Sequence, residues 1–358
     1  GLLLGRAVKA FHPSASHLEV ELSTGERLSV DMAVMSVGVR PDTAFLQGSG
    51  IKLSARGAIL VDAHMRTSRE HIYAVGDAVE VTHLITGLPA FIPLAGPANK
   101  QGRIAADNVF GLESTYKGTQ GSCVVKLFDM TVATTGLNEM AAKAAGLSFG
   151  KLYTHHAAHA TYYPGARNMN VKTLFDAKTG RILGAQLVGF EGVDKRCDVL
   201  ATAIRANLTA YDLAELELCY APPYSSAKDP VNMIGFSIEN LLTDKVRQFH
   251  WHDVAAAQQD ANALLLDVRT LREYDRGHIE GAVHVPLDDL RQRLSELDRA
   301  KTLYTYCQSG LRSYIACRIL SQSGFDCLNL SGGYRLYEMV TGESAFNAAP
   351  THPCGLKI

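Results

Sequence analysis

The sequence predicts a multidomain protein of mixed α/β and α+β class. At 358 residues the chain exceeds one typical domain. Hydrophobic residues make up 47% and charged residues 20%, so sizeable cores can form. The pattern of apolar residues changes near residue 120 and again near residue 248. We therefore expect domains over residues 1–36, 37–115, 116–246 and 247–346, followed by a tail over 347–358.

Charge and cysteine content exclude several classes of protein. A net charge of −1 and a pI near 7 argue against partners such as nucleic acid or an anionic membrane surface. No apolar run approaches the roughly 18–20 residues that a membrane span needs, and we expect no secretory signal. An odd number of cysteines without a Cys-x-x-Cys pair disfavours a disulfide framework and a zinc site. We predict a cytoplasmic protein without a metal site.

The first residues, GLLLGRAVKAF, resemble the middle of a secondary-structure element rather than its start. Alternating apolar and polar residues around Ser23-Thr24-Gly25 predict a β-hairpin, and MAVMSVG at 32–38 predicts a buried strand after it. A domain does not normally start with its last hairpin. We therefore expect the chain to be a fragment of a longer protein.

The second region is expected to carry a strand, a ligand-binding turn and a helix. The short apolar run at 72–75 predicts a strand in a parallel or fully covered sheet. Gly76 and Asp77 follow it at the carboxyl end, where ligands bind in open α/β sheets. We expect the next helix to be preceded by Pro97 and closed by Gly111.

The region 120–245 is expected to be strand-rich. Its last two strands form a predicted hairpin that turns at residues 177–180. Residues 197–216 follow as an amphipathic helical stretch. Asp229 and Pro230 then predict a helix start, with the aspartate as N-cap and the proline at the first helical position.

A cysteine loop, CQSGLRS, stands between an apolar-aromatic strand at 302–306 and an amphipathic helix. A thiol at Cys307 would face backbone N–H groups and the positive end of a helix dipole. Those donors and the Arg312 charge would favour the thiolate. Gly310 lets the loop curl, and Ser313 is expected to cap the helix.

This region resembles the rhodanese family. Four residues, 308–311, separate Cys307 from the arginine, whereas cysteine phosphatases have five, and the shorter loop suits a single sulfur atom. The flanks LLDVRTLREYDRGHIEGAVHVPL and LNLSGGYRLYEM also match. The resemblance implies that Cys307 takes up sulfane sulfur as a persulfide. It implies too that the N–H groups of 308–312 stabilise that sulfur, while Asp267 and Arg269 brace the loop.

The alternative for Cys307 is a buried structural cysteine that happens to precede a helix. For Cys317 and Cys327 the structural interpretation is preferred, since one lies on the helix and the other in the last strand.

The segment TSREHIYAVGDA resembles the second flavin motif of the pyridine nucleotide-disulfide oxidoreductases, with GVRPDTAFL and GAILVD before it. The resemblance implies part of a Rossmann-like FAD/NAD(P)-binding region that uses FAD and NADH or NADPH. Asp77 would accept a hydrogen bond from a ribitol hydroxyl, and Gly76 would permit close approach of the cofactor. The segment IPLAGPANKQGR would face the flavin pyrimidine edge through Pro93, Leu94, Ala95, Ala98 and Asn99.

Taken alone, a Gly-Asp pair after a strand is simply a turn. The family's Gly-x-Gly-x-x-Gly motif, its NAD(P)H fingerprint and its redox cysteine are also absent from this sequence. We therefore expect that the fragment alone neither reduces a disulfide nor holds FAD tightly.

Two further segments, HAAHATYYPGA and YAPPYSSAKDPVNM, are similar to the coenzyme A-disulfide reductase branch, some members of which are fused to rhodanese. The resemblance implies a homodimer in which Tyr220 and either Tyr162 or Tyr163 reach the partner subunit's active site. Coenzyme A would be a substrate or bound ligand there. The alternative for each tyrosine is packing at an interface.

The leading hypothesis is therefore reduction of CoA disulfide, CoA persulfide or polysulfide, driven by NAD(P)H through FAD and coupled to sulfur transfer by Cys307. The main alternative is a stand-alone rhodanese sulfurtransferase on a non-catalytic dimer scaffold. The hypothesis of a phosphatase or an arsenate-type reductase is supported by the cysteine loop alone. A water-forming NADH oxidase is disfavoured by the rhodanese fusion and by YAPPYSSAKDP.

Overall fold

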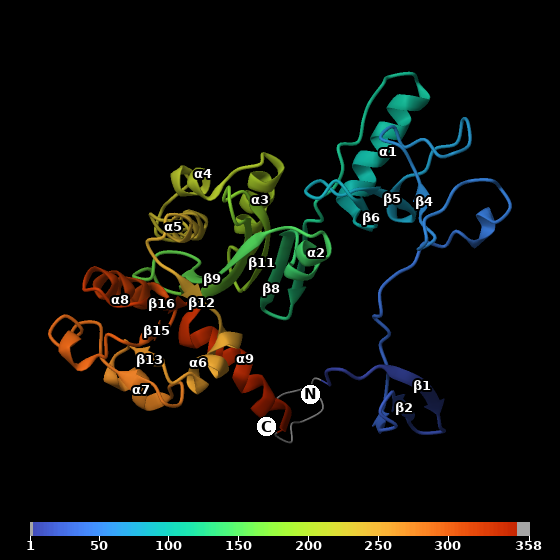
Figure 1. The fold of residues 1–358 in the computed structure, drawn as a ribbon. Helices are drawn as coiled ribbons and strands as arrows, with labels where there is room; N and C mark the ends of the chain where they lie inside the picture. Colours follow the sequence, from blue (N-terminus) through green and yellow to red (C-terminus); the bar gives the residue numbers. More distant parts are fainter. Residues whose placement is uncertain (1–2, 349–358) are drawn as a thin grey trace. The chain divides into compact units, whose positions relative to one another are not determined.

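The structure, a computed structural model, describes residues 3–348 (Figure 1). The chain divides into two units, residues 41–337 and the two ends, 1–40 with 338–358. We describe each by itself. Among residues 3–348 no helix has the length and apolarity that crossing a bilayer requires.

The N-terminal residues form a three-stranded antiparallel sheet, β1 (Val8–Pro13), β2 (Leu18–Leu22) and β3 (Arg27–Val30). The β2–β3 turn contains Gly25 at φ +84°, which confirms the predicted hairpin. The prediction of a strand at 32–38 is wrong. That segment pairs with no strand among the described residues, and without ladder hydrogen bonds its apolar side chains stay exposed.

Residues 41–115 contain a small sheet and one long helix. The prediction of a strand at 72–75 is wrong. Tyr73 makes only an isolated bridge with Arg66, and the positive φ of His71 keeps the preceding residues in a turn. Parallel pairing begins later, at Val79. The elements are η1 (Ala44–Leu46), β4 (Ile59–Leu60), η2 (Gly76–Ala78), β5 (Val79–Thr82), β6 (Pro89–Ala90) and α1 (Ala95–Val109).

The helix α1 starts earlier than predicted. It begins at Ala95, so Pro97 lies inside its first turn rather than before it. The first turn tolerates proline because its N–H groups have no intrahelical partner. Gly111, at φ +82°, follows the helix end as expected.

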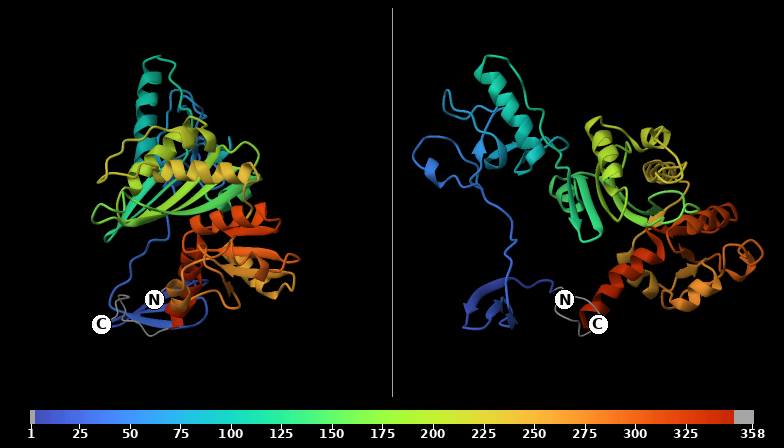
Figure 2. Two further views of the ribbon diagram at one scale, coloured as in Figure 1. Left: turned by 90° about the vertical axis from the view of Figure 1, so that its left-hand side faces the viewer. Right: turned by 180° about the vertical axis from the view of Figure 1, so that it is seen from behind.

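A five-stranded antiparallel sheet forms the middle of the chain, in the order β7-β8-β11-β10-β9. Two of the helices cover one face of this sheet (Figure 2), with α3 against β8 and β11 and α5 against β9. The predicted hairpin is confirmed as β10–β11. The strands are β7 (Cys123–Leu127), β8 (Met130–Gly136), β9 (Phe149–Ala157), β10 (Asn168–Asp176) and β11 (Ile182–Gly189).

Helices α3, α4 and α5 pack their apolar side chains against the sheet to make one core, whereas Ala142 of α2 belongs to a separate cluster with Leu174 and Leu183. The predicted start at Asp229 and Pro230 is confirmed, because the Asp229 carboxylate accepts a hydrogen bond from the Val231 N–H at 3.0 Å. The helices are α2 (Glu139–Ala144), α3 (Val193–Arg205), α4 (Ala210–Glu215) and α5 (Pro230–Leu242).

The last domain is a parallel five-stranded sheet in the order β12-β16-β15-β13-β14. Its central strand β15 (Thr302–Tyr306) delivers Cys307 at its carboxyl end. The other strands are β12 (Gln248–Phe249), β13 (Ala263–Asp267), β14 (Val283–His284) and β16 (Cys327–Leu330). The helical elements are η3 (Trp251–Asp253), α6 (Val254–Gln259), α7 (Leu271–Arg276), η4 (Leu294–Glu296), α8 (Leu311–Gln322) and α9 (Gly333–Ala348).

Candidate functional site

The Cys307 thiol lies at the positive end of a helix. The residue is fully buried, and its Sγ accepts hydrogen bonds from the Gly310 N–H at 3.2 Å and from the Ser313 hydroxyl at 3.3 Å. Gly310, at φ +103°, is the N-cap of α8. Two donors and a helix dipole aimed at one sulfur stabilise negative charge there.

The role predicted for Ser313 needs a correction. Gly310 occupies the N-cap, and Ser313 lies inside the first turn of α8 with its hydroxyl also 3.2 Å from the Gly310 carbonyl. A glycine fits the cap because its backbone is left-handed there. The single hydroxyl proton of Ser313 is therefore shared between the Cys307 sulfur and the Gly310 carbonyl.

Arg312 is paired with a carboxylate on α7. Its guanidinium donates to both carboxylate oxygens of Glu273, at 2.8 and 2.6 Å. These hydrogen bonds lower the pKa of Glu273 to about 2, and the Glu273 contact together with the Cys307 charge raises the pKa of Arg312. Arg312 thus holds α7 against the cysteine loop, and much of its charge is compensated.

Asp267 and Arg269 support the loop, as the sequence led us to expect. They form a buried ion pair at 2.7 Å. Arg269 also donates to the Gln308 side chain at 3.1 Å and to the Gly277 carbonyl at 2.7 Å. Because Gln308 follows Cys307 directly, this pair fixes the start of the loop.

A second loop, residues 331–335, packs against the backbone of Cys307 and Gln308. The Tyr334 N–H donates to the Cys307 carbonyl at 2.8 Å, and the Arg335 N–H donates to the Gln308 carbonyl at 3.0 Å. A Cβ on Gly333, at φ +59°, would lie 2.6 Å from the Cys307 carbonyl oxygen. Only glycine fits there. The Gly-Gly pair in LNLSGGYR was the available signal for this contact.

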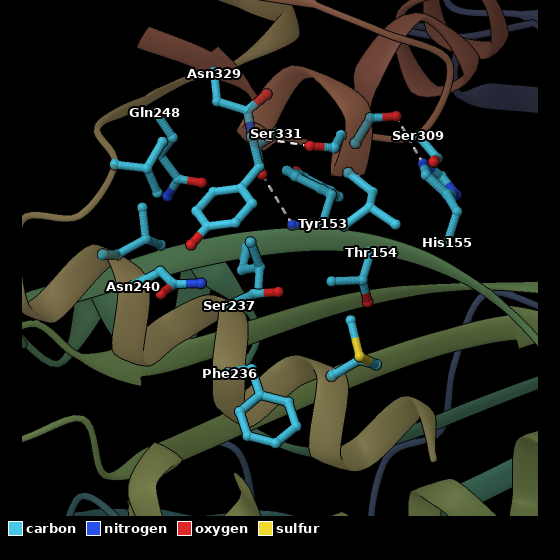
Figure 3. A pocket seen from close by; sticks show the side chains of 18 of the residues that line it. Tyr153, Thr154, His155, Phe236, Ser237, Asn240, Gln248, Ser309, Asn329 and Ser331 are labelled. Carbon is cyan, nitrogen blue, oxygen red and sulfur yellow. Dashed lines mark hydrogen bonds between the residues drawn. The ribbon is translucent and has the colours of Figure 1, made fainter. Parts of the chain in front are cut away.

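A cavity of about 310 Å³ adjoins the cysteine loop (Figure 3). Ser309 and the residues after it line one side, while Ser237 and Asn240 of α5 and the strand β9 line the other. Thr154 contributes a buried hydroxyl for which the described residues supply no partner. Sequence reasoning missed this cavity, since its walls come from segments distant in the chain.

Two hydrogen bonds join β9 to the loop behind Cys307. The Tyr153 N–H donates to the Ser331 hydroxyl at 3.0 Å, and the His155 Nε2 lies 2.9 Å from the Gly332 carbonyl oxygen (Figure 3). Burial lowers the pKa of His155, so the neutral ring is favoured. The cysteine loop and the middle sheet are therefore connected through residues 331–333.

The predicted tyrosines behave differently from one another. The Tyr162 and Tyr220 hydroxyls are 2.7 Å apart, and both side chains are exposed. Their hydrogen bond raises the pKa of Tyr162. Tyr163 instead packs edge-on against His159. The structure thus brings together Tyr162 and Tyr220, while Tyr163 makes a different contact.

Sequence reasoning missed Arg196, which holds the two tyrosine segments together. It forms a fully buried ion pair with Asp229 at 2.8 Å and donates to the carbonyls of Ala158 at 2.9 Å and Tyr224 at 3.5 Å. The available signal was an arginine on the apolar face of the helix, directly before Cys197.

The residues predicted to hold a flavin lie around η2 and the start of α1. The Gly76 N–H donates to the Gln101 side chain at 2.8 Å, and a Cβ on Gly76 would contact Ala98. Asp77 is exposed beside them. Pro93 leads into Leu94, the N-cap of α1, and no side chain caps the N–H groups at Ala95.

An exposed carboxylate and a helix N-terminus without a side-chain cap form a donor and acceptor set that fits a polyhydroxyl chain and a pyrimidine edge. The residues present therefore fit FAD chemically.

Three family models match the chain. They are a pyridine nucleotide-disulphide oxidoreductase model over residues 1–102, its dimerisation domain over 122–230, and a rhodanese-like domain over 250–339. Together they account for most of the chain.

Named relatives and solved structures agree with these models. A coenzyme A disulfide reductase of Staphylococcus aureus is 37% identical over 219 residues, covering 61% of this chain and 50% of the relative. The reduced CoADR-RHD of Bacillus anthracis is 44% identical, with a TM-score of 0.90 over 94% of this chain and 60% of its own. An NAD-dependent persulfide reductase from A. fulgidus is 36% identical, with a TM-score of 0.85 over 93% of this chain and 60% of its own.

The chain spans about half the length of the curated relatives it matches.

Proposed function

Because the chain belongs to the pyridine nucleotide-disulphide oxidoreductases and carries a rhodanese-like domain, we propose that it acts in NAD(P)H-driven, FAD-dependent reduction of CoA disulfide, CoA persulfide or polysulfide. In this proposal Cys307 carries sulfane sulfur. The main support for the proposal is the Cys307 sulfur, which accepts hydrogen bonds from two donors at a helix N-terminus. The same chain contains the flavin-type region.

The geometry of the loop supports a sulfur-transfer step. The Cys307 thiolate attacks the outer sulfur of a persulfide R–S–SH, the S–S bond breaks, and R–S⁻ leaves and takes a proton from water. Cys307 now carries a persulfide, and an acceptor thiolate reverses the step by attacking its outer sulfur. The Gly310 N–H and Ser313 O–H stabilise the charge that passes through this site.

Arg312 has a positioning role in this proposal. Its pairing with Glu273 compensates most of its charge, so the sulfur depends mainly on the loop amide and the hydroxyl. The cavity beside Ser309 offers space for a sulfur donor or acceptor on one side of the loop.

The flavin-type region would hold the electron-transferring cofactor. Bound FAD would supply two-electron transfer from the nicotinamide to the sulfur substrate. Asp77 would accept a hydrogen bond from a ribitol hydroxyl, and Gly76 would leave room for the chain of the cofactor. The Ala95 N–H at the start of α1 would face the flavin ring.

The tyrosine pair would serve the thiol substrate. A phenol hydroxyl can donate a hydrogen bond to a leaving thiolate or protonate it. Tyr162 and Tyr220 are exposed and already share a hydrogen bond, so a substrate sulfur can be received by either phenol. In a homodimer they would complete the partner subunit's site, which makes coenzyme A a substrate shared between subunits.

The proposal places this enzyme in the cytoplasm. The six cysteines that the structure describes are all free thiols, which suits a reducing compartment.

Two assays on the purified protein test the proposal. Sulfur transfer from a persulfide to a thiol should be lost in Cys307→Ser and kept in Cys123→Ser, which changes an exposed cysteine far from the loop in sequence. NADH or NADPH oxidation should rise on addition of CoA disulfide or polysulfide. Sulfur transfer without any dependence on NAD(P)H would instead favour a stand-alone sulfurtransferase.

A further inference from the structure

Two buried cysteines that the proposed chemistry does not use lie side by side in the last domain. Cys317 belongs to α8 and Cys327 to β16, and the Cys327 Sγ is 3.5 Å from the Cys317 carbonyl oxygen. A hydrogen bond between the two thiols raises the pKa of Cys317 and lowers that of Cys327. Cys327 is also the more exposed of the two, at 7% against 1% for Cys317, so it is the thiol that a small disulfide reaches first.

A second pocket gives access to this pair. It has a volume of about 380 Å³, and both cysteines line it. Its wall also carries three cationic side chains, from Lys245, Arg247 and Arg318. Asp244 and Asp326 lie in the same wall, where Asp326 pairs with Arg247, while Lys245 pairs with Glu239 outside the pocket. Three cationic side chains thus stand against two carboxylates, and this net charge of +1 favours an anionic molecule.

We propose that Cys317 and Cys327 form a redox-active dithiol, which small anionic disulfides entering this pocket oxidise to an internal disulfide. The inference is independent of the function proposed for Cys307.

The reaction needs two exchanges. The Cys327 thiolate attacks one sulfur of a disulfide R–S–S–R, forming a mixed disulfide and releasing R–S⁻. Cys317 then loses its proton to solvent and attacks the Cys327 sulfur, so that a second R–S⁻ leaves. The two protein thiols are oxidised by two electrons, and the small disulfide is reduced to two thiolates.

The bond would join the two elements that frame the sulfur-carrying loop. The first turn of α8 provides the donors to Cys307, and Asn329 of β16 donates to the Gly310 carbonyl at 3.1 Å. A covalent link from α8 to β16 would therefore act on the frame of the loop without consuming Cys307 itself.

Peptide mapping tests the proposal directly. The probe is the dianionic aryl disulfide 5,5′-dithiobis(2-nitrobenzoate), which releases a coloured thiolate at each exchange. Trypsin cleaves after Arg312, Arg318 and Arg335, so each cysteine falls in a separate peptide: Cys317 in 313–318, Cys327 in 319–335 and Cys307 in 302–312.

We expect peptide 313–318 linked to peptide 319–335, in wild type and equally in Cys307→Ser. Recovery of both as unlinked thiols, under conditions that fully modify the exposed Cys123 and Cys219, would overturn the proposal. Linkage of either peptide only to 302–312 would overturn it too.

The charge of the pocket is tested by a matched pair of variants. Arg247→Gln should slow formation of the link by the dianionic probe severalfold, because one cation leaves the pocket wall. Arg293→Gln removes another exposed arginine paired with a carboxylate, outside this pocket, and should leave the rate unchanged. Equal rates in both variants would contradict the preference for an anionic disulfide.

Discussion

At the scale of single residues, the sulfur site is built largely from backbone. The Gly310 N–H contacts the sulfur directly, and Gly333 lets the second loop approach the Cys307 carbonyl. Neither contact needs a particular side chain, but both need a backbone that only glycine adopts readily. The position of the Cys307 thiol thus depends on two glycines, which have no functional side chain.

Gly333→Ala tests this dependence. The added Cβ would meet the Cys307 carbonyl at 2.6 Å, and the φ of +59° adds backbone strain. We expect loss of most sulfur-transfer activity and a fall of about 2–3 kcal/mol in the free energy of unfolding. Urea unfolding and a persulfide-to-thiol transfer assay measure the two effects.

Gly281→Ala is the matched control, because Gly281 has a φ of +79° and nothing within 4 Å of the added Cβ. This variant should lower the free energy of unfolding by only about 1 kcal/mol and leave sulfur transfer intact. Equal activity in the two variants would contradict the role given to Gly333.

Glu273→Gln tests the ion pair with Arg312. The folded-state pKa of Glu273 is about 2, below its ordinary value of 4.5, so the carboxylate stabilises the fold above pH 4.5. That stabilisation is lost as the pH falls from 4.5 towards 2. Because the pair is partly exposed, we expect the variant to be about 1 kcal/mol less stable at pH 7.

The difference between Glu273→Gln and wild type should shrink in urea unfolding at pH 3. Glu280→Gln, at an exposed position in the same domain, should match wild type at both pH values. A difference for Glu273→Gln that does not change with pH would argue against the ion pair.

Residue identities that local sequence determines were predictable. Cys307, Gly310 and the bracing pair Asp267–Arg269 followed from the spacing of the loop and from a family resemblance. The role of Ser313 was predicted wrongly, because whether a hydroxyl caps the helix or contacts the sulfur depends on which residue takes the N-cap.

At the scale of elements, strand predictions failed where pairing partners decide the outcome. The runs at 32–38 and 72–75 have strand-like composition, yet neither forms a ladder in the described residues. A strand requires a neighbour to satisfy its backbone groups, and a local pattern does not reveal that neighbour. The helix start at Asp229 was predictable because its capping interactions are local.

Asp229→Asn tests how the tyrosine segments are held. It would leave the buried Arg196 guanidinium without its counter-charge, and we expect a loss of about 3 kcal/mol in the free energy of unfolding. Because Arg196 also holds the carbonyls of Ala158 and Tyr224, the Tyr162–Tyr220 pair should separate. Urea unfolding and tyrosine fluorescence on pH titration measure the two effects.

Asp212→Asn provides the comparison, since Asp212 also lies at a helix start but near the surface, bonded to Thr209. It should cost only about 1 kcal/mol. Similar losses in the two variants would contradict the central place of the Arg196–Asp229 pair.

At the scale of the whole molecule, half-buried histidines lie near the contact between the middle sheet and the last domain. Burial lowers the pKa of His156 and of His250 to about 4, and the His250 ring packs edge-on against Tyr153. In the unfolded chain these histidines bind protons near pH 6.5, so unfolding takes up protons between pH 6.5 and 4. The fold therefore loses stability as the pH falls through this window.

We expect the free energy of unfolding, measured in urea, to fall as the pH is lowered from 7 to 5. His250→Gln should reduce that fall by roughly 1–2 kcal/mol, whereas His278→Gln, at an exposed position, should leave it unchanged. An identical pH dependence in His250→Gln and wild type would show that this histidine does not contribute.

The proposed function rests on Cys307 as the carrier of sulfane sulfur within a flavin-type reductase. The most direct test is the mass of the tryptic peptide 302–312 after incubation of the protein with glutathione persulfide and alkylation. The proposed function predicts a gain of one sulfur atom on Cys307, reversed by a thiol acceptor. An unmodified Cys307, or sulfur only on the exposed Cys123 and Cys219, would contradict it.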